Sequence, residues 1–138
     1  MYMFLKKIFP VFLAVLISAC ATGQPTTKIT VNLKEFAFEP GTITVTAGQP
    51  VELALVNEGA VEHDFAIETI PAEDISTEGS MSGHDMSDQH SEFALHTATG
   101  PGETSVLRFT PTEPGTYKII CSVPGHLDAG MTGELIVK

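Results

Sequence analysis

The stretch that decides the fold is Tyr117–Met131, YKIICSVPGHLDAGM, near the end of the chain. It carries Cys121, His126 and Met131 in the order Cys-x4-His-x4-Met. A strand-like run, TYKIIC, leads into this segment, a Pro-Gly pair turns the chain, and a second strand-like run, TGELIVK, follows. Because one short loop between two adjacent strands then presents all three side chains, we expect a thiol, an imidazole and a thioether to lie around one point.

A fourth candidate ligand lies far upstream, where His63 occurs in the run VEHDF. One cysteine, two histidines and a weakly binding methionine form the ligand set of a mononuclear blue-copper site. Thiolate and thioether sulfur suit cuprous ion, and imidazole suits both oxidation states. Each of these residues alone is more often core filling or a turn residue. The prediction of one type 1 copper ion therefore depends on the combination.

These residues also carry a resemblance that spans residues 28–138. The runs FAFEPGTITVTAGQPVELALVNEG, HDF and FTPTEPGTYKIICSVPGH resemble those of the cupredoxins, the small blue-copper electron carriers, and especially the auracyanin-, sulfocyanin- and plastocyanin-like members. The resemblance implies an all-β, Greek-key β-sandwich. It also implies copper ligation by four side chains: His63, Cys121, His126 and Met131.

The resemblance implies a route for the electron as well. In relatives of this family the histidine of the cysteine loop has an exposed ring edge through which the electron passes. His126 would then be the exit, and Pro124, Gly125 and Leu127 would form part of the docking patch.

The chain departs from the family pattern at Asp64. Many members have Asn directly after the first ligating histidine, where it ties the two ligand loops together. One interpretation is that Asp64 accepts a backbone N–H bond from the Cys121 loop in the same way, in which case its charge also lowers the reduction potential. The other interpretation is a surface aspartate without such a role.

The start of the chain is typical of an exported lipoprotein. Residues 1–19 combine a basic start, MYMFLKK, with an apolar run that is short for a membrane span, as in a secretory signal peptide. Small residues directly before Cys20 match a lipoprotein cleavage box, so we expect lipid on Cys20 and a tether over residues 20–27. The alternative is an ordinary signal peptide with an incidental cysteine. The predicted location is the membrane, facing the periplasm or the cell exterior.

The charge of the chain limits its partners. The formal net charge of −10 makes nucleic acid an unlikely ligand. It favours redox protein partners with a basic docking patch, although acidity kept for solubility explains the charge equally well. Only two cysteines occur, and lipid on Cys20 leaves Cys121 as a single free thiol that metal ligation would protect. We expect a monomer.

Short alternating runs separated by Gly and Pro predict about eight strands and no second domain. The strands are expected at residues 28–38, 42–46, 51–57, 63–70, 92–98, 104–111, 116–121 and 132–138. The expected large core residues are Phe36, Phe38, Phe65, Phe109 and Tyr117.

The polar, acidic segment at residues 71–92 is predicted to be a long loop. Its Met81, His84, Met86 and His90 form a candidate auxiliary copper site. A solvated insertion of accidental composition is the alternative. His96, just beyond the segment, has the surroundings of a strand residue and is the weakest metal candidate.

No catalytic constellation is found, so an enzyme is not expected. A saturated four-ligand site also lacks the open position that catalytic metals keep. The first hypothesis is a one-electron carrier between membrane or periplasmic redox partners. The alternative is a copper acquisition, storage or delivery protein that uses the Met/His-rich loop. A metal-free, adhesion-like sandwich is a third possibility.

Overall fold

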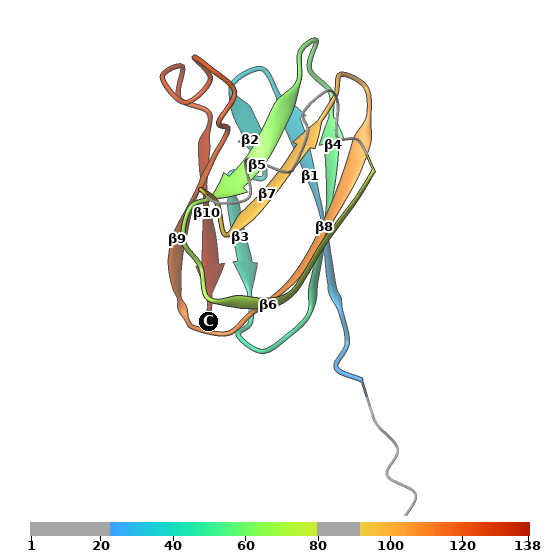
Figure 1. Cartoon of the computed structure of the whole chain (residues 1–138), viewed down its shortest axis with the longest axis vertical. Coiled ribbons are helices and arrows are strands. Elements are labelled where there is room, and N and C mark those ends of the chain that lie inside the picture. The colour runs from blue at the N-terminus through green and yellow to red at the C-terminus, as the bar shows by residue number, and fades with distance from the viewer. Residues whose placement is uncertain (1–22, 80–91) are drawn as a thin grey trace, which may run out of the picture.

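The computed structural model describes residues 23–79 and 92–138 and contains ten strands in them (Figure 1). Their bounds are β1 Thr27–Lys34, β2 Ala37–Glu39, β3 Thr42–Val45, β4 Val51–Asn57, β5 His63–Ile67, β6 Ala72–Gly79, β7 Leu95–Thr99, β8 Thr104–Pro111, β9 Gly115–Ile120 and β10 Thr132–Val137. Within the described ranges there is no helix with the length and apolar character needed to cross a bilayer.

The strands form two five-stranded sheets, in the orders β2-β1-β4-β8-β6 and β3-β10-β9-β5-β7. Side chains alternate between buried and more exposed positions along β4 and β10, as the period of two in their sequences predicts. The inner faces of both sheets supply one core, and Leu53 and Leu135 are fully buried in it. Full burial of one such leucine contributes about 1.5–3 kcal/mol. The predicted all-β sandwich is therefore confirmed.

The structure has two strands more than the predicted eight, and the first of these arises because the first predicted strand is divided into β1 and β2. A turn at Glu35 and Phe36 separates β1 from the antiparallel β2. Phe36 has a positive φ of 58° and is 46% exposed, so its assignment to the core is wrong. The other predicted core aromatics, Phe38, Phe65 and Phe109, are buried, and Tyr117 is partly buried against the core.

The second added strand is β6, which occupies part of the predicted loop at residues 71–92. It pairs antiparallel with β8 at the edge of its sheet, with a bulge between Glu73 and Ser76. An edge strand with few buried side chains has little need of apolar residues, so its composition resembles that of a loop. The loop prediction is therefore wrong for Ala72–Gly79. The candidate ligands Met81, His84, Met86 and His90 lie outside the described residues, as do residues 1–19 and Cys20.

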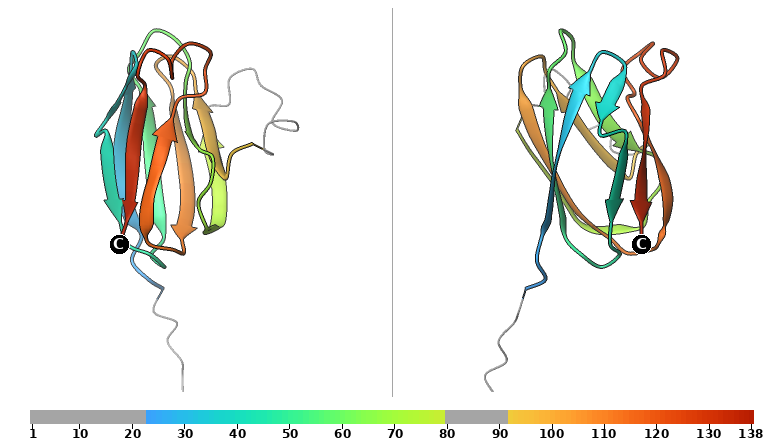
Figure 2. Two further views of the ribbon diagram at one scale, coloured as in Figure 1. Left: turned by 90° about the vertical axis from the view of Figure 1, so that its left-hand side faces the viewer. Right: turned by 180° about the vertical axis from the view of Figure 1, so that it is seen from behind.

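The arrangement of the strands brings two distant segments together. The loop between β9 and β10 and the beginning of β5 lie at the same end of the sandwich (Figure 1). The C-terminus and the segment that precedes β1 lie at the opposite end, and both views of Figure 2 show the same separation. The predicted ligands from the two segments therefore share one end of the molecule.

Candidate metal centre

The loop from Cys121 to Met131 is closed by its own backbone. The N–H of Met131 donates to the carbonyl of His126 at 3.0 Å, and the N–H of Cys121 donates to the carbonyl of Met131 at 3.2 Å. Gly125 and Gly130 adopt φ values of 86° and 96°, a left-handed conformation that glycine adopts without a steric penalty. Short-range hydrogen bonds and two glycines therefore hold the loop that carries all three predicted loop ligands.

His63 follows a turn that is held by the Asn57 side chain, which also reaches Thr99 on the distant strand β7. The turn before β5 is held by Asn57, whose side-chain amide donates to the carbonyls of Val61 and Thr99, each at 2.8 Å. Its Oδ1 accepts the N–H of Gly59, also at 2.8 Å. A Cβ at Gly59 would lie 2.8 Å from Nε2 of His63, so the backbone approaches this imidazole too closely for any other residue.

Three of the four predicted ligand atoms converge. One ligand atom each from His63, Cys121 and His126 lies within 4.8 Å of the other two. Nδ1 of His63 is 3.1 Å from Nδ1 of His126, and Sγ of Cys121 is 3.3 Å from Nδ1 of His126. His63, Cys121 and Met131 have no exposed surface, and His126 is 9% exposed. Met131 belongs to the same buried cluster of core residues as Cys121.

The donor set fits a metal ion. An imidazole nitrogen lies about 2 Å from a bound first-row metal, which places two such nitrogens roughly 3 Å apart, as they are here. Burial, with the neighbouring His126, lowers the pKa of His63 and favours the neutral ring that a metal requires. Burial raises the pKa of the Cys121 thiol to about 12, so copper binding near neutral pH must release a proton from it.

Asp64 is not a surface residue, because only 4% of it is exposed. Its Oδ1 accepts the backbone N–H of Ser122 at 2.5 Å, and its Oδ2 accepts the hydroxyl of Ser122. Its own N–H donates to Sγ of Cys121 at 3.5 Å. The structure thus shows the hydrogen-bonded link between the two segments, whereas the effect of the Asp64 charge on the reduction potential stays a prediction.

The ionised form of Asp64 is stabilised by its hydrogen bonds. Burial by itself favours the protonated acid, but donors from His96 and Ser122 outweigh it and hold the pKa of the carboxyl below its ordinary value. The roles of Asn57, His96 and Ser122 were not predicted from the sequence. The run Asn57-Glu58-Gly59 indicated a turn, but the role of His96 depends on pairing between β5 and β7.

His126 is more enclosed than the resemblance implies. The ring of Phe36 meets the His126 ring edge-on, with the centroids 5.3 Å apart. Phe36 itself is 46% exposed, and Leu127 is 41% exposed. Pro124 and Gly125 are exposed beside them. The outer surface at this end is therefore formed by Phe36 and the loop residues around His126.

Comparison with known proteins gives a consistent result. A family model described as a cupredoxin-like domain matches residues 7–137. The copper-resistant cuproprotein CopI of Rubrivivax gelatinosus is 31% identical over 119 residues, which cover 86% of this chain and 69% of that protein. Auracyanin-A of Chloroflexus aurantiacus is 32% identical over 124 residues, covering 84% and 76%.

A solved structure supports the same relationship. Auracyanin A, a "blue" copper protein from Chloroflexus aurantiacus, superposes with a TM-score of 0.60 and 26% identity over 83% of this chain and all of that one. The family match extends over both segments that carry the converging ligands. The chain therefore belongs to the cupredoxin family, and its cofactor is one copper ion.

Proposed function

We propose that this chain is a type 1 copper protein that carries single electrons between redox partners, and that it is not an enzyme. The observation that carries the proposal is the buried convergence of two imidazoles and a thiol at one end of the sandwich. Bound copper supplies a one-electron couple between its cupric and cuprous forms. His63, Cys121, His126 and Met131 are the proposed ligands, and together they leave no position for a substrate.

The protein's contribution to this task is rigidity. The loop ligands are held by backbone hydrogen bonds, and the segment before His63 is held by Asn57. Ligands that are fixed by the fold change little in position when the charge on the metal changes. Burial of the sulfur keeps water away from the site.

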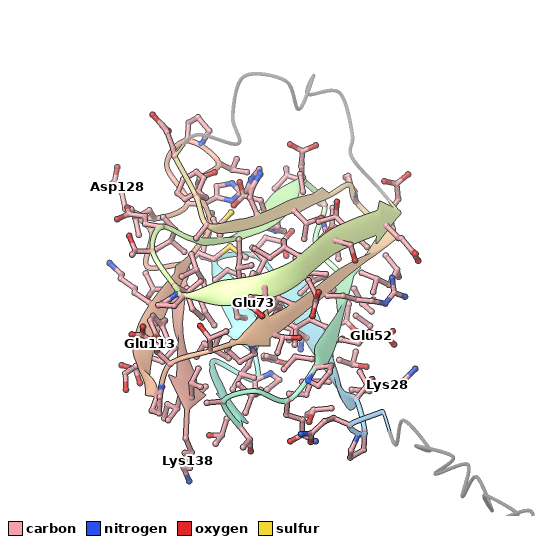
Figure 3. All side chains as sticks on the ribbon, turned by 60° about the horizontal axis from the view of Figure 1, so that its bottom comes forward. Lys28, Glu52, Glu73, Glu113, Asp128 and Lys138 are labelled. Atoms are coloured by element: carbon pink, nitrogen blue, oxygen red, sulfur yellow. The ribbon has the colours of Figure 1, made fainter. Side chains whose placement is uncertain are left out.

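The surface around Phe36 is the proposed contact for partners. Phe36, Pro124 and Leu127 give this end an apolar character, while Asp128 on the same loop is exposed. Exposed carboxylates elsewhere, such as Glu73 and Glu113, also lie on the outside of the sandwich (Figure 3). A redox protein with an apolar contact area and a basic rim fits these features, with charge acting mainly on the association rate.

We also propose that the chain is exported and anchored by lipid on Cys20. The described chain begins at the end of the sandwich opposite to the ligand loop (Figure 1). A tether that leaves from that end would let the copper site face away from the membrane. Radiolabelled palmitate incorporation, compared between wild type and Cys20→Ala, tests this location directly.

The experiment for the carrier role uses the protein from residue 21 onward, loaded with one cupric ion. We expect strong visible absorption from thiolate-to-copper charge transfer, a reversible one-electron wave in voltammetry, and rapid electron exchange with a small redox protein. A colourless complex, or copper that dissociates on reduction, would contradict the proposal.

The second candidate is a copper acquisition, storage or delivery protein. The observation that favours it is the 31% identity to a protein named as a copper-resistant cuproprotein. The auxiliary ligands Met81, His84, Met86 and His90 would belong to this task. Deletion of residues 80–91, which leaves β6 intact, separates the two candidates. If the protein is an electron carrier, the deletion variant should keep its reduction potential and its single copper ion. If it acquires, stores or delivers copper, the deletion variant should no longer bind additional cuprous ions.

A further inference from the structure

The two strands that lead to the metal centre are barely paired with each other. β5 begins at His63 and β9 ends just before Cys121, yet their only registered pair in the described residues is Ala66 with Ile120. On its other side β5 pairs with β7 over five residues. The distance between the imidazole of His63 and the thiol of Cys121 is therefore not fixed by a continuous backbone ladder.

The Asp64 carboxylate connects β5 to the residue after Cys121, where backbone pairing between β5 and β9 is absent from the described residues. It accepts both the backbone N–H and the hydroxyl of Ser122, the residue that follows Cys121. A carboxylate that can rotate about its χ angles holds a neighbouring loop only if its own orientation is fixed. Ser122 alone cannot fix it, because Ser122 lies in the loop that has to be held.

His96 fixes the orientation of the Asp64 carboxylate. It lies on β7 opposite Ala66, and therefore on the same sheet face as Asp64 and diagonal to it. Its Nε2 is 3.1 Å from Oδ2 of Asp64, and its ring stacks on Phe93 with centroids 5.5 Å apart. His96 is 8% exposed. Since an ionised carboxylate only accepts hydrogen bonds, the proton of the His96–Asp64 bond lies on Nε2.

We propose that His96 is a positioning residue of the copper site, which acts through Asp64 to hold the Cys121 loop against His63. Among the described residues, its hydrogen bond is to Asp64 and its ring contact is to Phe93, and neither is a predicted ligand. His96 on β7 contacts the Asp64 side chain on β5, and Asp64 contacts Ser122, which lies just after β9. These contacts connect β5 and β9 where the two strands are not paired. The inference rests on the copper site and is independent of whether the copper carries electrons or is handed on.

The test uses two amide variants that differ by one methylene. His96→Gln keeps an N–H donor at about the reach of Nε2, whereas His96→Asn keeps the amide but is too short to reach Asp64. In the copper-free protein we expect faster amide hydrogen exchange at Ser122 for the Asn variant and near wild-type exchange for the Gln variant. We expect the Asn variant to bind copper about tenfold more weakly, with a changed visible spectrum, as is usual when a partner behind the ligands is lost.

Thr97→Val is the matched control, because Thr97 is the next residue on β7 and its buried hydroxyl has no hydrogen-bond partner in the described structure. It should leave both the exchange at Ser122 and the spectrum unchanged. If the Gln and Asn variants behave alike, whether both match wild type or both lose only thermal stability, the inference is overturned. Nitrogen NMR of the wild-type imidazole is independent of any variant, and a proton on Nδ1 instead of Nε2 would overturn it as well.

Discussion

The β9–β10 loop and the beginning of β5 meet at the same metal centre but are held in different ways. The loop carries three of the proposed ligands and is closed by backbone hydrogen bonds between residues at most ten positions apart, such as Cys121 to Met131. The beginning of β5 carries one ligand and is held by side chains, with Asn57 and His96 each reaching across more than thirty residues. The loop is thus a local structure, whereas the position of His63 depends on the completed sandwich.

The difference has a consequence for folding and metal binding. A segment held by short-range bonds can form its ligand geometry early, because little loop-closure entropy opposes it. The His63 side can reach its position only after β4, β5 and β7 have associated. Substitutions in the loop should therefore affect mainly the metal, and substitutions around β5 should affect the metal and the stability of the fold together.

The largest expected effect is on the loop side, for Cys121→Ser. The serine oxygen cannot replace the soft thiolate, so the strong visible absorption should be lost completely and copper binding should weaken greatly. The far-ultraviolet circular dichroism should remain that of the folded sandwich, because the volume at this buried position hardly changes. Retention of the absorption band in this variant would show that the colour arises elsewhere.

The next largest effect is expected for a substitution that removes the support of the segment before β5. Asn57→Ala leaves the carbonyls of Val61 and Thr99 and the N–H of Gly59 without their partner, at a cost of about 3 kcal/mol in the free energy of unfolding. Urea unfolding of the copper-free protein measures this loss, and copper affinity should fall in parallel. Asn32→Ala on β1, a half-exposed position, is the control and should cost less than about 0.5 kcal/mol. Equal stabilities of the two variants would contradict the assigned role of Asn57.

The same contrast explains what could be predicted from the sequence. The proximity of Cys121, His126 and Met131 could be predicted from their spacing, because they lie in one short segment whose turn residues are visible in the sequence. His63 was a candidate ligand by its residue type, but its distance from the loop in the sequence meant that its pairing with the loop came from the resemblance to cupredoxins. The link from His96 through Asp64 could not be predicted, since it depends on the register between β5 and β7. β6 was missed because an edge strand has little apolar surface to bury.

The core was predicted more reliably than the turns. Alternating apolar residues identified Phe38, Phe65 and Phe109 as buried because the period of two specifies a face of a sheet. Phe36 breaks that rule, since a turn with positive φ places it outside the alternation. The docking patch predicted from the sequence therefore lacked Phe36, which is the largest exposed apolar side chain beside the metal centre.

A smaller effect concerns the pH dependence of stability through Asp64. The pKa of this carboxyl is lower in the folded protein than its ordinary value of 3.8. Its contribution to stability is therefore fully present above about pH 4 and is lost as the pH falls through the lower folded-state pKa. Unfolding free energies of copper-free wild type and Asp64→Asn, measured between pH 2 and pH 6, should converge toward acid. A constant difference between the two curves would contradict this assignment.

The smallest expected effect distinguishes the contribution of the Phe36 backbone conformation from that of the Phe36 ring. A non-glycine residue in the left-handed region costs about 1 kcal/mol, so Phe36→Gly should be more stable than Phe36→Ala by roughly that amount. Both variants remove the ring that lies edge-on against His126 and should change the rate of electron exchange to the same extent. Thermal unfolding and voltammetry at an electrode measure the two quantities separately. If the alanine variant were the more stable, the turn would carry no backbone strain. If exchange rates differed between the variants, the turn conformation rather than the ring would control access to the loop ligand.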